Sequence, residues 1–320
     1  MTRMSITLAS ALAIATLIVG VQKAKLVIRL NPGFADNDKD GNVGNLKSGL
    51  ATAKFPSSNG YFVLYYGDGK TEEELKNNFE RIRATQPAFV IVGYFGEKSS
   101  GPVDLKQAKQ VLCVLRGRSA KECVKNPSVV PNNTGIRTIY YVTADEEDSI
   151  ASSQIKSVMD LGYDGVFFDE TNRLSDATQT QRYKKLAKSV HDYGNDKNKK
   201  LVIANPGVSD NSVCGMFEYV DIVSVENHWN TEVPKCSGVD KSRWLAVQGD
   251  PSGETGEYAQ PPHNNELDKA VSRLNCFRKH GGYWYFTTGW DGDKPQHWKL
   301  PAFLETFAEE AKKESIVCSE

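Results

Sequence analysis

The sequence predicts a (β/α)8 barrel, in which eight parallel strands alternate with helices along the chain. Short β-rich runs recur, and most are almost continuously apolar, as expected of strands buried on both faces of a parallel sheet. Helical patterns lie between these runs, and such alternation indicates a parallel sheet with helices outside it. The sequence has neither GxGxxG after its first strand nor a P-loop, so a nucleotide-binding open sheet is disfavoured against the closed barrel.

The expected elements follow from these patterns in chain order. The β-rich runs are Lys25–Leu30, Tyr61–Tyr66, Ala88–Phe95, Ile136–Val142, Gly165–Asp169, Leu201–Ala204, Asp221–Val225, Arg243–Val247 and Gly282–Thr287. The expected helices are Glu72–Arg83, Leu105–Leu115, Ile150–Leu161, Thr178–Tyr193, Leu267–Lys279 and Ala302–Lys313. Thr71 and Glu74 predict a capping box at the first helix. The barrel therefore runs from about residue 61 to about residue 315, with Lys25–Leu30 as an additional strand before it.

The amino terminus carries the pattern of an exported protein. Ile6–Val21 is apolar and follows Arg3, as in a secretory signal, and its length is near the lower limit for a spanning helix. We expect residues 1–24 to be a signal peptide or an N-terminal membrane anchor, and residues 25–320 to form a single domain. The protein is then a secreted or cell-surface monomer.

Composition excludes one class of partner. The 39 Lys and Arg residues balance 40 Asp and Glu residues, which gives a formal net charge of -1. A chain so balanced has no overall field to hold a polyphosphate, so we expect no nucleic-acid partner.

Six cysteines suggest disulfide bonds in an exported chain. Pairing Cys113 with Cys123 and Cys214 with Cys236 would close two local loops, and pairing Cys276 with Cys318 would tie down the last helix. Six cysteines allow about fifteen pairings, so the sequence alone leaves the connectivity open. None of them has the spacing of a zinc site.

Polar and aromatic residues gather where the expected strands end, and a (β/α)8 barrel places its chemistry at the carboxyl ends of its strands. Carboxylates can transfer protons or attack an anomeric carbon, aromatic faces stack on sugar rings, and Asn or Thr side chains hydrogen-bond hydroxyl groups. The pattern therefore predicts a cleft for a polysaccharide substrate. The expected substrate-binding residues are Tyr65, Tyr94, Tyr141, Thr143, Asn172, Asn205, His228, Trp229, Gln248, Thr288 and Trp290.

The segment Asp164–Glu170, which reads DGVFFDE, resembles the spherulin 4 family. The similarity continues in the family's order at Ile139–Thr143, Asn205–Gly207, Asp221–Glu226 and Tyr283–Thr288. These are secreted or surface-associated (β/α)8 proteins, and they include endo-acting glycoside hydrolases that cleave α-1,4-linked N-acetylgalactosamine in microbial exopolysaccharide. The resemblance implies an exported hydrolase of that kind. The alternative is a non-catalytic surface barrel that binds glycan or serves a structural role.

By this resemblance, Asp169, Glu170 and Glu226 are the catalytic carboxylates. Strand alternation then turns Asp169 toward the barrel axis and Glu170 outward. Glu226 ends a strand two further on, and alternate strands share a layer, so Glu226 and Asp169 are expected to face each other across the mouth. We expect these two to be the acid/nucleophile pair and Glu170 to tune one of them. The alternative for Glu170 is a salt bridge with a neighbouring Arg or Lys.

An acidic segment before the barrel has two interpretations. Asp36, Asp38 and Asp40 occupy positions 1, 3 and 5 of a calcium loop, and Gly41 occupies position 6. Position 12, normally a bidentate Glu, is Lys47. The segment is therefore either a structural Ca²⁺ site or a solvated acidic turn, and the expected hydrolysis requires no cofactor.

Overall fold

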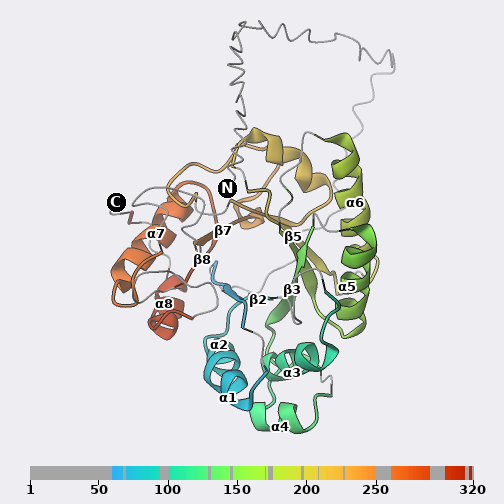
Figure 1. The fold of residues 1–320 in the computed structure, drawn as a ribbon. Coiled ribbons are helices and arrows are strands. Elements are labelled where there is room, and N and C mark those ends of the chain that lie inside the picture. The colour runs from blue at the N-terminus through green and yellow to red at the C-terminus, as the bar shows by residue number, and fades with distance from the viewer. Residues whose placement is uncertain are drawn as a thin grey trace, which may run out of the picture. The chain divides into compact units, whose positions relative to one another are not determined.

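The computed structural model confirms the predicted (β/α)8 barrel (Figure 1). It describes residues 60–67, 70–93, 101–128, 131–144, 147–169, 171, 176–195, 198–207, 209–225, 228–248, 261–288, 300–313 and 317–318. Eight strands form one sheet in chain order, and every neighbouring pair is parallel. The expected strand at Lys25–Leu30 and the acidic segment that follows it lie outside the described residues.

The strands are short and mostly buried, as their apolar sequences predict. They are β1 (Val63–Tyr65), β2 (Phe89–Val92), β3 (Arg137–Thr143), β4 (Gly165–Asp169), β5 (Leu201–Ala204), β6 (Ile222–Ser224), β7 (Trp244–Gln248) and β8 (Trp284–Thr287). The ring closes between the last strand and the residues before the first: Tyr61 bridges Tyr285 in parallel, and the Tyr285 amide donates to the carbonyl of Gly60 at 3.1 Å.

Helices occupy most of the crossovers between strands (Figure 1). A continuous helical segment comprises α1 (Glu72–Glu74), the π-helical η1 (Leu75–Glu80) and α2 (Arg81–Ala84). The others are α3 (Leu105–Leu115), α4 (Ala120–Lys125), α5 (Asp148–Asp160), α6 (Ala177–His191), α7 (Leu267–Lys279) and α8 (Leu304–Ala311). Around β6 the described crossover residues form only short 3₁₀ helices, η2 (Asn211–Glu218) and η3 (Lys241–Arg243).

The predicted capping box at the first helix is confirmed only in its Thr71 half. The Thr71 hydroxyl accepts a hydrogen bond from the Glu74 amide at 3.0 Å, but the Glu74 carboxylate accepts one from the Tyr65 hydroxyl at 3.3 Å. A complete capping box begins α4 instead, where Ser119 and Glu122 satisfy each other's backbone amides.

Three disulfide bonds join the cysteines in the pairs considered from the sequence. Cys113–Cys123 links α3 to α4, Cys214–Cys236 links η2 to the segment before β7, and Cys276–Cys318 links α7 to the carboxyl-terminal residues. Such bonds are typical of proteins that reside in oxidising compartments. Among the helices that the structure describes, none has the length and apolar character needed to cross a membrane. The expected signal or anchor, residues 1–24, lies outside the described part of the chain.

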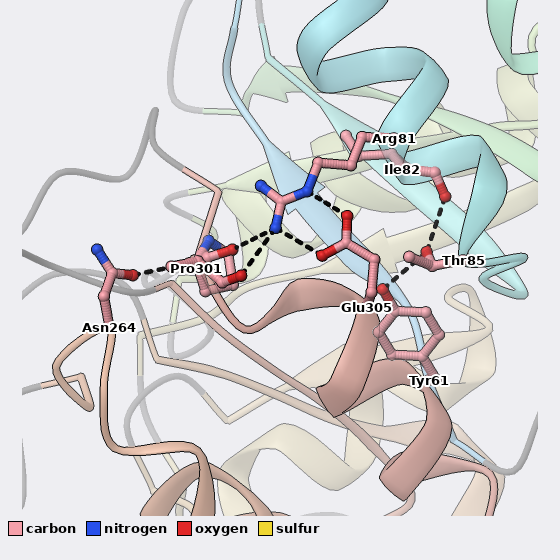
Figure 2. Close-up of polar contacts among 8 residues, drawn as sticks. Tyr61, Arg81, Ile82, Thr85, Asn264, Pro301 and Glu305 are labelled. Carbon is pink, nitrogen blue, oxygen red and sulfur yellow. Dashed lines mark hydrogen bonds and ion pairs between the residues drawn. The ribbon is translucent and has the colours of Figure 1, made fainter.

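A polar network holds the last helix against the first βα unit (Figure 2). Arg81 in α2 donates through Nη2 to Oε2 of Glu305 in α8 at 2.7 Å, and its Nε contacts the other carboxylate oxygen. The same Nη2 donates to the carbonyls of Pro301 at 3.1 Å and Ala302 at 3.0 Å. The Ala302 amide in turn donates to Asn264 at 2.8 Å. The network therefore reinforces the closure of the barrel from outside the sheet.

The buried hydroxyl of Tyr61 beside this network is also satisfied (Figure 2). It lies 3.0 Å from Oγ1 of Thr85, which donates its own proton to the carbonyl of Ile82 at 2.7 Å. Thr85 must therefore be the acceptor for Tyr61. Burial raises the pKa of Tyr61, so this hydroxyl stays protonated at neutral pH.

Glu305→Gln should reduce stability at neutral pH but not at low pH. The hydrogen bond from Arg81 holds the pKa of the Glu305 carboxyl below its ordinary value. A lowered folded-state pKa stabilises the protein above the unfolded pKa of about 4.3, and this contribution is lost as pH falls through the folded pKa. Because 52% of the Glu305 side chain is exposed, we expect no more than about 1 kcal/mol, or roughly 2–4 °C in the thermal midpoint.

The measurement is the thermal midpoint of the wild type and the variant at pH 7 and at about pH 3. Glu309→Gln is the matched control, since Glu309 lies on the same helix and pairs with the nearby Lys312 at 2.9 Å. An equal loss at both pH values, or an equal loss in the control, would contradict this account.

Candidate active site

Asp169, the last residue of β4, is the centre of a polar cluster at the carboxyl end of the barrel. Its Oδ2 accepts a hydrogen bond from the Tyr141 hydroxyl at 2.9 Å, and its Oδ1 accepts one from Nδ2 of Asn205 at 2.8 Å. Tyr141 lies on β3 and Asn205 directly follows β5, so three neighbouring strands supply the cluster. Asp169 is half-buried, so its carboxylate is held in one orientation without being sealed off.

The strand register places these side chains next to one another. Thr143 pairs with Asp169 across β3 and β4, and the Ala144 amide donates to the Asp169 carbonyl at 3.0 Å. On the other side, the Asn205 amide donates to the Phe168 carbonyl at 2.8 Å. Backbone hydrogen bonds therefore continue the ladder to the very end of β4, which fixes the carboxylate on a rigid part of the fold.

Aromatic rings line the wall beside Asp169. The rings of Tyr66 and Tyr141 meet edge to face with their centroids 5.4 Å apart. The ring centroids of Tyr141 and Phe167 are 6.0 Å apart. Gly93, just after β2, makes room for this arrangement, because a Cβ there would lie 2.7 Å from the Tyr66 Cα. Tyr66 and Tyr141 are both half-buried, so part of each residue is accessible to a ligand.

Two buried hydroxyl groups lie in the same region. Oγ1 of Thr143 and Oγ1 of Thr171 have no hydrogen-bond partner within the described part of the chain, although the residues are only 6% and 1% exposed. A buried hydroxyl without a partner costs roughly 1–3 kcal/mol. Because Thr143 is the register partner of Asp169, a ligand hydroxyl or amide placed against the carboxylate could satisfy it.

Acidic residues at the opposite end of the barrel serve the fold instead. Asp164 and Asp221, which precede β4 and β6, accept hydrogen bonds from backbone amides of the preceding strands at 3.0 and 2.8 Å. Asp221 also pairs with His191 at 3.0 Å. Nearby, Lys200 donates to the carbonyl of Tyr163 at 2.6 Å, and burial lowers the pKa of this lysine. Asp164 and Asp221 are therefore engaged in holding strands together.

Tyr65 does not face the mouth, contrary to the sequence expectation. Its hydroxyl donates to Glu74 at 3.3 Å and accepts a hydrogen bond from Asn78 at 2.6 Å, while its ring packs against Phe79 in η1. Side chains alternate along a strand, so the next residue, Tyr66, faces the interior instead. Sequence reasoning missed Tyr66, and counting the alternation along β1 is the signal that could have found it.

Gln248 is also placed differently from expectation, because it faces α7 and not the mouth. The side chain is fully buried, and its Oε1 accepts hydrogen bonds from Arg273 at 2.8 Å and from the Tyr285 hydroxyl at 3.0 Å. The Arg273 guanidinium lies 4.8 Å from the centre of the Trp229 ring, and Trp229 is only 1% exposed. Gln248 and Trp229 therefore help to pack the strand ends against α7.

The remaining predicted residues divide into two groups. Among those described, Thr288 is fully buried and donates its amide to the Gln248 carbonyl at 3.0 Å, whereas His228 is partly exposed. The structure brings together Asp169, Tyr141, Thr143 and Asn205, and Thr171 is a neighbour that sequence reasoning missed. Outside the described residues lie Glu170, Glu226, Tyr94, Asn172, Trp290, Asp36, Asp38 and Asp40. Within the described part, no group of three side chains has the makeup of a metal site.

The fold and the cluster define a (β/α)8-barrel protein with an oriented carboxylate at the carboxyl end of its strands. Residues 124–309 match the family model described as Spherulation-specific family 4. This match spans more than half of the chain, so the protein belongs to that family, and the resemblance seen in the sequence is confirmed. Among curated proteins, no sequence matches.

Several solved structures are similar at low identity. Sph3 from Aspergillus clavatus, in complex with GalNAc, is 14% identical, with 79% of this chain and 97% of that chain covered and a TM-score of 0.49. A cycloalternan-degrading enzyme from Trueperella pyogenes is 9% identical, with 81% and 48% covered and a TM-score of 0.42. A truncated 3-deoxy-D-arabino-heptulosonate 7-phosphate synthase from Thermotoga maritima is 12% identical, with 79% and 85% covered and a TM-score of 0.40. At such identities and scores, none of them indicates the activity of this chain.

Proposed function

We propose that the protein is an exported glycoside hydrolase that cleaves an amino-sugar exopolysaccharide internally, at α-1,4-linked N-acetylgalactosamine. The observation that carries this proposal is the half-buried carboxylate of Asp169, held by Tyr141 and Asn205 at the carboxyl end of the barrel. Membership of the spherulin 4 family supports the choice of substrate, because the family includes hydrolases of that polymer.

Hydrolysis of a glycosidic bond requires a second carboxyl group across the bond from the first. We propose Glu226 for this role, with Glu170 tuning one of the pair. Strand alternation supports this choice. Ser224, the last residue of β6, is buried and pairs in register with Leu245, and alternation predicts that Glu226, two positions later, shares its face. One carboxyl would protonate the leaving oxygen and the other would act as nucleophile or base. A separation of ~5–5.5 Å would give retention, and ~6.5–9.5 Å would give inversion.

The described cluster suits the rest of this chemistry. Tyr141 and Asn205 fix the plane of the Asp169 carboxylate, so its reacting oxygen need not be reoriented during the reaction. The rings of Tyr66 and Tyr141 offer faces or edges for the C–H groups of a sugar. The Thr143 hydroxyl, which has no hydrogen-bond partner among the described residues, can bond a hydroxyl or acetamido group. We propose Tyr94, Asn172, His228 and Trp290 as further contacts from the surrounding loops.

Release of reducing ends from a polymer of α-1,4-linked N-acetylgalactosamine tests this function. We expect the wild type to generate new ends with a bell-shaped pH profile, since one carboxyl must be protonated while the other is ionised. Glu226→Gln should reduce the rate by about 10³-fold or more while the thermal midpoint changes little. Binding of the polymer without release of ends by the wild type would instead indicate the alternative, a glycan-binding barrel.

A further inference from the structure

A cleft of about 620 Å³ opens at the end of the barrel opposite to Asp169. Its walls come from the segment between β6 and η3, from η3 itself and from the turn after α7. Trp244, the first residue of β7, lies at its base and is almost fully buried. Since the strands are parallel, a cleft at the start of β7 is separated from the cluster at the end of β4 by the length of the barrel.

The walls of this cleft are fixed by covalent and backbone contacts. The disulfide bond between Cys236 and Cys214 ties the segment before β7 to η2. The Val233 amide donates to the carbonyl of His280 at 3.0 Å, which joins that segment to the turn after α7. Gly281 adopts a φ of +91°, and a Cβ there would also lie 3.0 Å from Val233. The cleft is therefore formed before any ligand arrives, and binding costs little reorganisation.

Positive charge dominates the lining. Lys235, Lys241 and Lys279 contribute three ammonium groups. Among the described residues that line the cleft, Glu232 is the one acid, and it pairs with Lys235 at 3.2 Å. Lys241 is held over the Tyr283 ring at 5.6 Å, so its charge is positioned. In a chain whose formal net charge is -1, this is a local excess of positive charge. An anion entering the cleft would be attracted to it.

The other lining residues narrow the ligand class. Val233, Pro234 and Val239 supply apolar surface. Among the lining residues that the structure describes, the side-chain acceptors are Ser237, Glu232 and the imidazole of His280. A neutral sugar needs acceptors as well as donors for its hydroxyl groups, while a carboxylate or sulfate needs donors alone. The volume falls within the range of about 300–1,000 Å³ that is typical of small-ligand sites.

We propose that this cleft binds an acidic segment of a polysaccharide through its carboxylate or sulfate groups. Such a site would hold an acidic polymer on the protein at a place separate from the mouth, where the proposed N-acetylgalactosamine substrate binds. The proposal does not depend on hydrolysis at Asp169. It holds equally for a barrel that binds glycan without cleaving it, so either proposal can fail alone.

Calorimetric titration of the Asp169→Asn full-length chain with hexagalacturonate tests the proposal without interference from catalysis. We expect the acidic hexamer to bind, with affinity falling as NaCl is raised, and its fully methyl-esterified form to bind much more weakly. Lys235→Gln combined with Lys279→Gln should weaken binding by about tenfold. The matched control is Lys156→Gln combined with Lys188→Gln, which removes the same charge from exposed positions on α5 and α6.

Three outcomes would overturn the proposal. Equal weakening by the control pair would show that only the net charge matters. Equal affinity for the methyl ester would show that the anionic groups are not recognised. Equal affinity for monomeric galacturonate would assign the cleft to a small free anion and not to a polymer. Release of reducing ends by the wild-type chain, measured separately, reports on the active site alone.

Discussion

Asp169→Asn is expected to lower turnover by about 10³-fold or more while leaving the thermal midpoint within about 2 °C of the wild type. The change removes the charge and the ability to attack or transfer a proton. It preserves the shape of the side chain, because an amide can still accept from Asn205 and can donate to the Tyr141 oxygen. The measurement is kcat and KM for release of reducing ends, together with thermal unfolding of the same sample.

Tyr141→Phe provides a graded comparison on the same carboxylate. It deletes one hydrogen bond to Asp169 but retains the charge and the ring that contacts Tyr66. A hydrogen bond to a charged group contributes about 1.5–3 kcal/mol, so we expect a loss of roughly tenfold to a hundredfold, well short of that for Asp169→Asn. If Asp169→Asn keeps more than a tenth of the activity, Asp169 is not catalytic. A large fall in its thermal midpoint would mean a structural role.

Buried strands made the fold predictable, because a strand covered on both faces has a continuous apolar sequence that does not depend on its register. All eight barrel strands overlap the runs expected from sequence, and α3 and α7 have the bounds expected for them. The sequence also shows no helical pattern around β6, and the described crossovers there contain only 3₁₀ helices. The missed helix α4 is short, but the Ser119 and Glu122 pair was a readable start signal.

Side-chain direction at the strand ends was harder to predict than the strands themselves. Tyr65 and Tyr66 are adjacent and chemically alike, and a one-residue shift in the alternation decides which of them faces the mouth. Gln248 shows the same problem in another form: a polar residue at a strand end looked like a ligand contact, but Arg273 from α7 supplies its partner. Such a partner lies far along the chain, so no local pattern reveals it.

Phe89→Ala should cause one of the largest losses of stability available in this barrel. Phe89 begins β2 and is fully buried, with its ring stacked on Phe62 at 4.9 Å and in edge contact with Trp284 of β8 at 5.1 Å. Phe89 therefore packs β2 against residues on both sides of the junction where the barrel closes, Phe62 before β1 and Trp284 in β8. Removing a buried Phe costs about 3–5 kcal/mol, or roughly 6–20 °C in the midpoint for a domain of this size.

Thermal unfolding of Phe89→Ala, Phe89→Leu and Leu105→Ala separates the reasons for such a loss. Phe89→Leu retains most of the volume and should cost less than half as much, while Leu105 is 46% exposed and its change should shift the midpoint by about 1–2 °C. A small loss in Phe89→Ala would mean that neighbouring rings collapse into the space. Phe89 lies at the start of its strand, whereas Asp169 lies at the end of another. The folded fraction of Phe89→Ala should therefore keep the wild-type KM. That result would show that closure of the barrel affects stability and not the geometry of the mouth.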